Sequence, residues 1–414
     1  MARDPHDPTS DEYYTKYESI QEEINYYYEA NPDVFRNKTI LCPCDDPDWS
    51  NFTKFFSSSN FLHYGLKALI CTSYAYGKHE VTEETKASPQ YDPEKEKTHG
   101  KLYILTRDMI QNGEMPESIP WKYLEGDGDY ASEEVTNICK TADVIITNPP
   151  FSLFVAREDD KPSFIKWCVD SEKQFLVIGD LRKSYKVGMY PYLENNRCWV
   201  GVTAVKRFRT PEGKEKTFGN IVWYTNIEHM KHIKPLEGLR TMQENLSSNR
   251  AFLKEMIKIR DNLKSIPKDG DLNPEEWLEA KEWLNRNGYY SYFNCDAIEI
   301  PIASAIPSDY PGVMGVSPSM LMNGLCPEQF EIVGTSSTIE KSMVHTVVGD
   351  EIQFIKEGKT VWTTPYTVSE RKMGNSLRIN KDGVPDNAPF ARFMIRYTEE
   401  WKVAHPELFS VIKE

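Results

Sequence analysis

The residues with the clearest chemical meaning form a short loop, Asn148-Pro149-Pro150-Phe151, directly after the apolar segment Val144–Thr147. At this composition, an Asn-Pro-Pro-aromatic string is expected about 0.01 times by chance, so the loop carries information. The Asn148 side-chain oxygen and the Pro149 carbonyl can each accept a hydrogen bond from a planar amine, while consecutive prolines fix φ and remove competing N–H donors. Such acceptors favour a tetrahedral nitrogen, which methylation of a nucleobase amino group requires.

Phe151 adds an aromatic face to this loop. Stacking of an extruded base on such a face is worth about 1–3 kcal/mol, comparable with the few kcal/mol that extrusion costs. An alternative interpretation is a turn that ends a strand and places an aromatic plug in the core. Ligands of open α/β sheets bind just beyond the carboxyl ends of strands, which favours the first interpretation.

A second loop, Cys44-Asp45-Asp46, follows the apolar segment Lys38–Pro43. The segment Ile40–Phe52 contains no glycine, which argues against NAD or FAD, because glycine allows the close approach of a pyrophosphate. Carboxylates suit the ammonium and sulfonium groups of S-adenosylmethionine instead. Solvated turn carboxylates are the alternative for Asp45 and Asp46.

Gly126-Asp127-Gly128-Asp129 lies upstream of the Asn-Pro-Pro-Phe loop. A carboxylate here can accept a hydrogen bond from an adenine amino group, although a plain Asp-Gly turn explains the pattern equally well. The second predicted strand ends in Cys71-Thr72-Ser73, with no acid to bind ribose hydroxyls.

The elements that must position these loops alternate between strands and helices. Apolar runs predict strands over 38–43, 65–72, 101–106, 142–147, 174–179 and 220–225, and helices over 50–58 and 164–169. The charged stretch 78–101 is predicted to be a surface insertion. This alternation predicts an α/β fold with a mostly parallel sheet covered on both faces.

The pattern changes near residue 235, so we predict a catalytic domain over 1–235 and a second domain over 236–414. The second begins with predicted helices over 237–263 and 273–288. It continues with predicted strands such as 330–333, 352–355 and 390–397.

Charge is unevenly distributed along the chain. The formal net charge is −14, which by itself argues against a nucleic-acid partner. Residues 161–270, however, carry 21 basic and 12 acidic side chains, and Lys206, Arg207 and Arg209 with Phe208 between them are the densest part. This belt predicts contacts with an anionic polymer, with an ordinary solvated loop as the alternative.

Other classes are excluded by simpler observations. No apolar run approaches the roughly 20 residues that span a bilayer, so we expect a cytoplasmic protein. The eight cysteines are scattered, and neither they nor the eight histidines show zinc-ligand spacing. We therefore expect reduced thiols and no metal.

Several segments together resemble a known family. They are Tyr13–Tyr17, Cys44–Phe52, Gly126–Asp129, Thr147–Phe154, Gly312–Val316 and Pro327–Gly334. Their order and spacing are similar to the EcoRI-type family of DNA adenine-N6 methyltransferases, and the resemblance covers residues 13 to 397.

The resemblance implies a Rossmann-like, S-adenosylmethionine-dependent methyltransferase domain, followed by an α+β target-recognition region. It implies that Asn148 to Phe151 are catalytic. The implied cofactor-binding residues are Tyr14, Thr15, Cys44, Asp45, Asp46 and either Asp127 or Asp129.

We therefore expect a monomeric enzyme that flips an adenine out of double-stranded DNA and methylates its N6, with Lys206, Arg207 and Arg209 on phosphates. Methylation of an RNA base or a protein glutamine is one rival function. A catalytically silent, DNA-binding anti-restriction protein is another.

Overall fold

The computed structural model forms two compact units, Met1–Met230 and Lys231–Glu414. It describes residues 14–46, 48–75, 81–116, 120–157, 159–186, 188–209, 214–261, 275, 278, 281–282, 286, 288–292, 295–335, 352–356, 359–363, 378–381, 384–387 and 391–409. Within these residues, no helix is both long and apolar enough to cross a membrane.

The first unit is built on an eight-stranded sheet with the order β5-β4-β3-β2-β6-β7-β11-β8. Its centre consists of four parallel strands, β3 (Ala68–Thr72), β2 (Thr39–Cys42), β6 (Val144–Thr147) and β7 (Gln174–Asp180). The outer strands run antiparallel to their neighbours: β4 (Lys101–Thr106), β5 (Trp121–Tyr123), β11 (Ile221–Thr225) and β8 (Trp199–Ala204).

The expectation of a mostly parallel sheet is therefore wrong outside the centre. The predicted strands over 101–106 and 220–225 exist, but they run against β3 and β7. An apolar run specifies a buried strand and not its direction, which depends on the edge of the sheet from which the chain re-enters.

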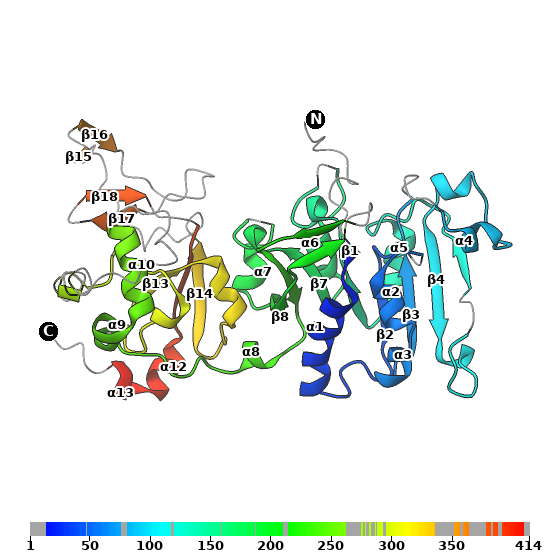
Figure 1. Ribbon diagram of the computed structural model, residues 1–414, viewed down its shortest axis with the longest axis horizontal. Coiled ribbons are helices and arrows are strands. Elements are labelled where there is room, and N and C mark those ends of the chain that lie inside the picture. Colours follow the sequence, from blue (N-terminus) through cyan, green and yellow to red (C-terminus); the bar gives the residue numbers. More distant parts are fainter. Residues whose placement is uncertain are drawn as a thin grey trace. The chain divides into compact units, whose positions relative to one another are not determined.

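Helices cover both faces of this sheet. Side chains of α1 (Tyr17–Ala30), α2 (Asn51–Phe56) and α3 (Asn60–His63) share one apolar cluster with alternate residues of the strands, and the three helices lie over one face (Figure 1). Buried side chains of α5 (Glu133–Lys140) and α6 (Phe164–Asp170) lie outside that cluster, against the other face. Ser50 and Ser132 cap α2 and α5 by accepting hydrogen bonds from backbone N–H groups.

A buried carboxylate fastens α1 to the edge strand β8. Glu23 is fully buried and accepts hydrogen bonds from the N–H groups of Val202, at 2.8 Å, and Thr203, at 2.7 Å. A Cβ on Gly201 would lie 2.4 Å from Glu23 Oε1, so this close approach requires glycine. The anchor fixes the helix that follows the N-terminal strand β1.

A small second sheet has the order β1-β9-β10, from β1 (Tyr14–Thr15), β9 (Arg207–Arg209) and β10 (Glu215–Thr217). The remaining helices of the first unit are short: α4 (Glu83–Ala87), α7 (Tyr190–Glu194) and four 3-10 turns at Lys95–Lys97, Arg107–Met109, Phe151–Leu153 and Leu181–Lys183. Helix α4 and the first of these turns lie in the predicted insertion, in which residues 78–80 are outside the described residues.

The second unit contains a four-stranded sheet with the order β12-β13-β19-β14. The strands are β12 (Ala297–Ile300), β13 (Val313–Val316), β19 (Phe393–Tyr397) and β14 (Phe330–Thr335). Two hairpins pair β15 (Ile352–Lys356) with β16 (Lys359–Thr363), and β17 (Arg378–Lys381) with β18 (Val384–Asn387). Short helices α8 (Met230–Ile233), α12 (Glu399–Ala404) and α13 (Pro406–Phe409) and two 3-10 turns (Ala303–Ala305, Pro318–Asn323) complete the described elements.

The helix predicted over 237–263 is two helices, α9 (Met242–Ser248) and α10 (Arg250–Asp261). Asn249 interrupts it, because its buried side chain accepts from the Phe252 N–H at 3.1 Å and donates to the Ser304 carbonyl at 2.8 Å. Asparagine side chains that bond the backbone in this way start helices rather than continue them. Most of the helix predicted over 273–288, including Trp277, Ala280 and Leu284, lies outside the described residues.

Candidate active site

The loops predicted to do chemistry converge on one edge of the large sheet. Strands β2, β3, β6 and β7 are parallel, so their carboxyl ends share this edge. The Cys44–Asp46 loop follows β2, and the Asn148–Phe151 turn follows β6. Because β2 and β6 are direct neighbours, the two loops lie side by side, as the prediction of a cofactor loop beside a catalytic loop requires.

The Asn-Pro-Pro-Phe segment forms a tight turn on the core. Pro149 is buried, while Asn148, Pro150 and Phe151 are half-buried. Phe154, three residues on, is fully buried against Tyr224, with ring centroids 5.4 Å apart. The anchoring aromatic is therefore Phe154, and Phe151 keeps part of its ring exposed.

Phe151 packs against the basic segment that is predicted to contact DNA. Its ring meets Phe208 edge to face, with centroids 6.2 Å apart and planes at 90°. Phe208 is the central residue of β9 and is fully buried, whereas Arg207, Arg209 and the preceding Lys206 are exposed. Side chains alternate between the two faces of a strand, so β9 directs the Phe208 ring toward the Asn148–Phe151 turn and two guanidinium groups toward solvent.

The N-terminal strand joins the same assembly. In the antiparallel pair β1–β9, Tyr14 lies opposite Arg209 and Thr15 opposite Phe208. The Asn51 side chain, in the first turn of α2, donates a hydrogen bond of 2.7 Å to the Thr15 carbonyl. The Thr15 hydroxyl is buried and has no hydrogen-bond partner among the described residues, which leaves it available to a ligand.

Asp45 couples the two principal loops. It is 4% exposed, and its carboxylate accepts hydrogen bonds from the hydroxyls of Ser50, at 2.6 Å, and Thr147, at 2.5 Å. Thr147 directly precedes Asn148, so Asp45 ties the loop after β2 to the start of the Asn148–Phe151 turn. Burial raises the pKa of Asp45 to about 7, against the lowering effect of these hydrogen bonds. Cys44, beside it, is half-buried.

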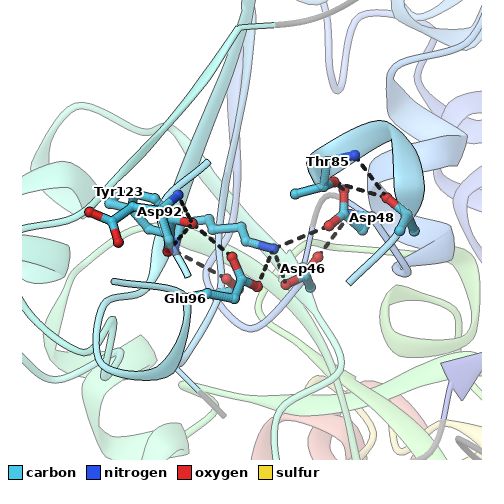
Figure 2. A network of polar contacts seen from close by, with 9 residues as sticks. Asp46, Asp48, Thr85, Asp92, Glu96 and Tyr123 are labelled. Atoms are coloured by element: carbon cyan, nitrogen blue, oxygen red, sulfur yellow. Dashed lines mark hydrogen bonds and ion pairs between the residues drawn. The ribbon is translucent and has the colours of Figure 1, made fainter. Parts of the chain in front are cut away.

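Asp46 belongs to an ionic network around a buried lysine (Figure 2). The Lys101 ammonium lies 2.9 Å from Glu96, 3.1 Å from Asp48 and 3.7 Å from Asp46. The Thr85 hydroxyl donates to the other oxygen of Asp48 at 2.8 Å, which ties α4 to this loop. Burial alone would lower the pKa of Lys101, but these carboxylates raise it, so the lysine stays charged.

Asp129 is engaged by an arginine. Two nitrogens of the Arg157 guanidinium contact the two carboxylate oxygens of Asp129 at 2.9 and 3.3 Å, and the guanidinium lies over the Tyr130 ring, 5.0 Å from its centroid. Burial would raise the pKa of Asp129, but the bonds to Arg157 outweigh it and lower the pKa. This carboxylate is therefore ionised and already paired.

Asp127, by contrast, is exposed. Its carbonyl accepts a hydrogen bond of 2.7 Å from the Ala75 N–H, just beyond β3. Between the two aspartates, Gly128 has φ +80°, and a Cβ there would lie 2.0 Å from the Ser73 carbonyl, so only glycine fits. The turn thus brings a carboxylate to the end of β3, where the local sequence has none.

Comparisons with known proteins show which family the chain is similar to. A family model described as the adenine-specific methyltransferase EcoRI matches residues 3–270 and 268–397. The type II methyltransferase M.EcoRI of Escherichia coli is 31% identical over 327 residues, which cover 78% of this chain and 85% of the relative. The chain belongs to the EcoRI family of adenine-specific methyltransferases.

Two mycoplasma proteins are also similar. M.MgeORF184P of Mycoplasma genitalium is 28% identical over 345 residues, and M.MpnI of Mycoplasma pneumoniae is 26% identical over 343 residues. Each match covers 78% of this chain and 82% of the relative, and both relatives are type II methyltransferases. No solved structure matches significantly. This methyltransferase is thus a DNA adenine methyltransferase of the restriction-modification type, and the resemblance inferred from its motifs is confirmed.

Membership in a methyltransferase family implies S-adenosylmethionine, and the residues at this edge fit it. Side chains around the ends of β2 and β3 are mainly acidic: Asp45, Asp46, Asp48, Glu96, Asp127 and Asp129, against Lys101 and Arg157. An excess of carboxylates suits a ligand with an ammonium and a sulfonium group. The buried hydroxyl of Thr15 and the exposed carboxylate of Asp127 are groups that can still bind such a ligand.

Sequence reasoning about this methyltransferase missed Lys101, Arg157 and the inward orientation of Phe208. Lys101 and Arg157 lie far along the chain from most of the carboxylates they bind, so no local spacing reveals them. Phe208 had a signal, because one apolar residue between two arginines is the period-2 pattern of a half-buried strand.

Proposed function

We propose that the enzyme holds an adenine, flipped out of duplex DNA, in the Asn148–Phe151 turn and methylates its N6 there. The observation that supports this most directly is the turn itself, half-exposed beside the loop after β2. The Asn148 side-chain oxygen and the Pro149 carbonyl accept the two N6 hydrogens. These bonds strengthen as the nitrogen becomes tetrahedral, so they stabilise the transition state more than the bound base.

Phe151 stacks on the flipped base, and its contact with Phe208 keeps the ring from rotating away. S-adenosylmethionine, when bound, supplies a methyl group made electrophilic by positive sulfur. When the nitrogen gains the methyl group it must lose one N6 hydrogen as a proton. Asn148 would orient that hydrogen by accepting its hydrogen bond, and the proton would pass to water, because an amide oxygen is too weak a base to keep it. Rate enhancement then comes mainly from positioning.

The proposed cofactor residues act in two ways. Tyr14, Thr15, Cys44 and Asp127 bind S-adenosylmethionine directly. The other three act while their side chains are held. Asp46 and Asp129, held by Lys101 and Arg157, add negative charge. Asp45, whose pKa burial raises to about 7, is held by Thr147 and positions the loop after β2 beside the bound cofactor.

Lys206, Arg207 and Arg209 are proposed to contact DNA phosphates, and the α+β unit Lys231–Glu414 to read the target sequence. A positively charged strand beside an acidic cofactor site explains how a chain of net charge −14 binds DNA. We propose that the enzyme acts as a monomer without metal, in the cytoplasm, where both substrates are found.

Two variants test the proposal with a matched control. With tritiated S-adenosylmethionine, Asn148→Ala should lose at least about 100-fold in methyl transfer to duplex DNA, as for loss of one oriented transition-state donor or acceptor. With 2-aminopurine at the target position, Phe151→Ala should lose the fluorescence rise of base flipping. Exposed Ser152→Ala, in the same turn, should match the wild type in both assays. Turnover retained in Asn148→Ala would refute the assigned role.

A further inference from the structure

The loop after β7 carries basic residues that the proposed function does not use. Arg182, Lys183 and Lys186 lie within seven residues of the end of this strand at Asp180. In the parallel pair β6–β7, Thr147 lies opposite Val177, so β7 ends at the same sheet edge as the catalytic turn. The three cations therefore follow a strand that ends at the same sheet edge as Asn148–Phe151.

Two glycines fix this loop against the catalytic turn. A Cβ on Gly179 would lie 2.6 Å from the Phe154 ring, and a Cβ on Gly188 would lie 2.1 Å from the Val155 carbonyl. Phe154 and Val155 directly follow the catalytic residues. Gly179 and Gly188, before and after the basic loop, thus pack closely against the two residues that follow Phe151 by three and four positions. Any side chain larger than that of glycine at either position would prevent this close packing.

Within the loop, Asp180 orients Arg182. The carboxylate accepts hydrogen bonds from the Arg182 backbone N–H at 2.8 Å and from its Nη2 at 2.6 Å, and the Asn220 amide also donates to it. The Arg182 side chain nevertheless stays 70% exposed. Its Nη1 has no hydrogen-bond partner among the described residues, so a held guanidinium presents unused donors to solvent.

Lys183 and Lys186 form no ion pair with any described carboxylate, and the Lys186 ammonium lies 5.1 Å from the centre of the Tyr185 ring. The loop also contacts the segment that follows the β9–β10 hairpin, because the Leu181 N–H donates a hydrogen bond of 2.8 Å to the Asn220 carbonyl. Asn220 lies between β10 and β11, so the basic loop and the β9–β10 hairpin meet at this residue.

We propose that Arg182, Lys183 and Lys186 bind phosphates of duplex DNA beside the target adenine, and that with the hairpin they form one basic rim around the catalytic turn. This inference rests on the proposed function. Phosphate fits better than an acidic peptide, because two exposed cations, Arg182 and Lys186, and the half-buried Lys183 lie together at one sheet edge and match a regular polyanion. The cofactor, a cation, is attracted to the acidic side of the same edge.

The test compares two triple variants of the full-length protein. The loop variant combines Arg182→Gln, Lys183→Gln and Lys186→Gln. The control variant combines Lys86→Gln, Lys95→Gln and Lys97→Gln. The control lysines are exposed and lie on the insertion, and both variants lower the net charge by three. Binding to a 30-base-pair duplex of mixed sequence is measured by fluorescence anisotropy, with sinefungin present, from 50 to 300 mM salt.

The loop variant should reduce the slope of log Kd against log salt by roughly 2 to 3, at about 0.9 for each lost phosphate contact, and the control should not. A charge-conserving variant, Lys183→Arg with Lys186→Arg, should keep the wild-type slope. Equal slopes in the loop variant and the wild type, an equal loss in both triple variants, or a loss confined to duplex RNA would each overturn the inference. Methyl transfer by the wild type to duplex DNA tests the proposed function separately, since it does not depend on the slope.

Discussion

Replacing Asp45 by asparagine should change how the stability of the first unit depends on pH. The native pKa of Asp45 is about 7, while its ordinary value is 3.8. Between these values the native protein holds a proton that the unfolded chain has lost, so folding takes up a proton. The native state is therefore stabilised below pH 4 and loses this stability as pH rises toward 7.

The size of the effect follows from the two pKa values. A difference of roughly three pH units corresponds to about 4 kcal/mol, lost at up to about 1.4 kcal/mol for each pH unit. Asparagine has nearly the same shape, and its amide can still bond the Ser50 and Thr147 hydroxyls, but it cannot ionise. The free energy of unfolding of Asp45→Asn, measured relative to that of the wild type, should therefore rise by about 2–3 kcal/mol between pH 5 and pH 7. A constant offset added by the substitution does not change this rise.

Urea denaturation at half-unit steps from pH 5 to pH 8.5 measures this difference, with Asp160→Asn as the control because Asp160 is exposed. The control should differ from the wild type by a constant amount at every pH. If the plots of unfolding free energy against pH for Asp45→Asn and the wild type also stay parallel from pH 5 to pH 7, the Asp45 carboxyl is not held neutral by burial and the reasoning fails.

Three further variants test separate parts of the molecule. Phe208→Ala should destabilise the first unit by about 3 kcal/mol in urea, because Phe208 is fully buried against Phe151; a loss below about 1 kcal/mol would contradict this packing. Asp127→Asn should weaken sinefungin binding by about tenfold or more in calorimetry, as expected for a lost charge-assisted hydrogen bond, and unchanged affinity would remove Asp127 from the cofactor site. Arg392→Met should cost about 3–5 kcal/mol by leaving the buried Glu299 without its guanidinium, and the double variant with Glu299→Leu should recover most of that loss.

Within the first unit, local sequence was enough to identify the chemistry and most of the central strands. The Asn-Pro-Pro-Phe string, the glycine-free loop after β2 and the apolar runs of β2, β3, β6 and β7 are contiguous, and their physical meaning does not depend on distant residues. Proline rigidity, side-chain acceptors and burial are properties that a few neighbouring residues carry by themselves.

Interactions between residues far apart in the chain could not be predicted from the sequence. The antiparallel direction of β4 and β11, and the break in the predicted helix at Asn249, depend on which segments pair in three dimensions. The same holds for Lys101 among its carboxylates, because a charge can be buried only where the folded chain brings its partners within a few ångströms. The residue types of the site were thus set by sequence, while the tertiary structure decided which of its charges are already paired, since pairing requires contacts that only folding creates.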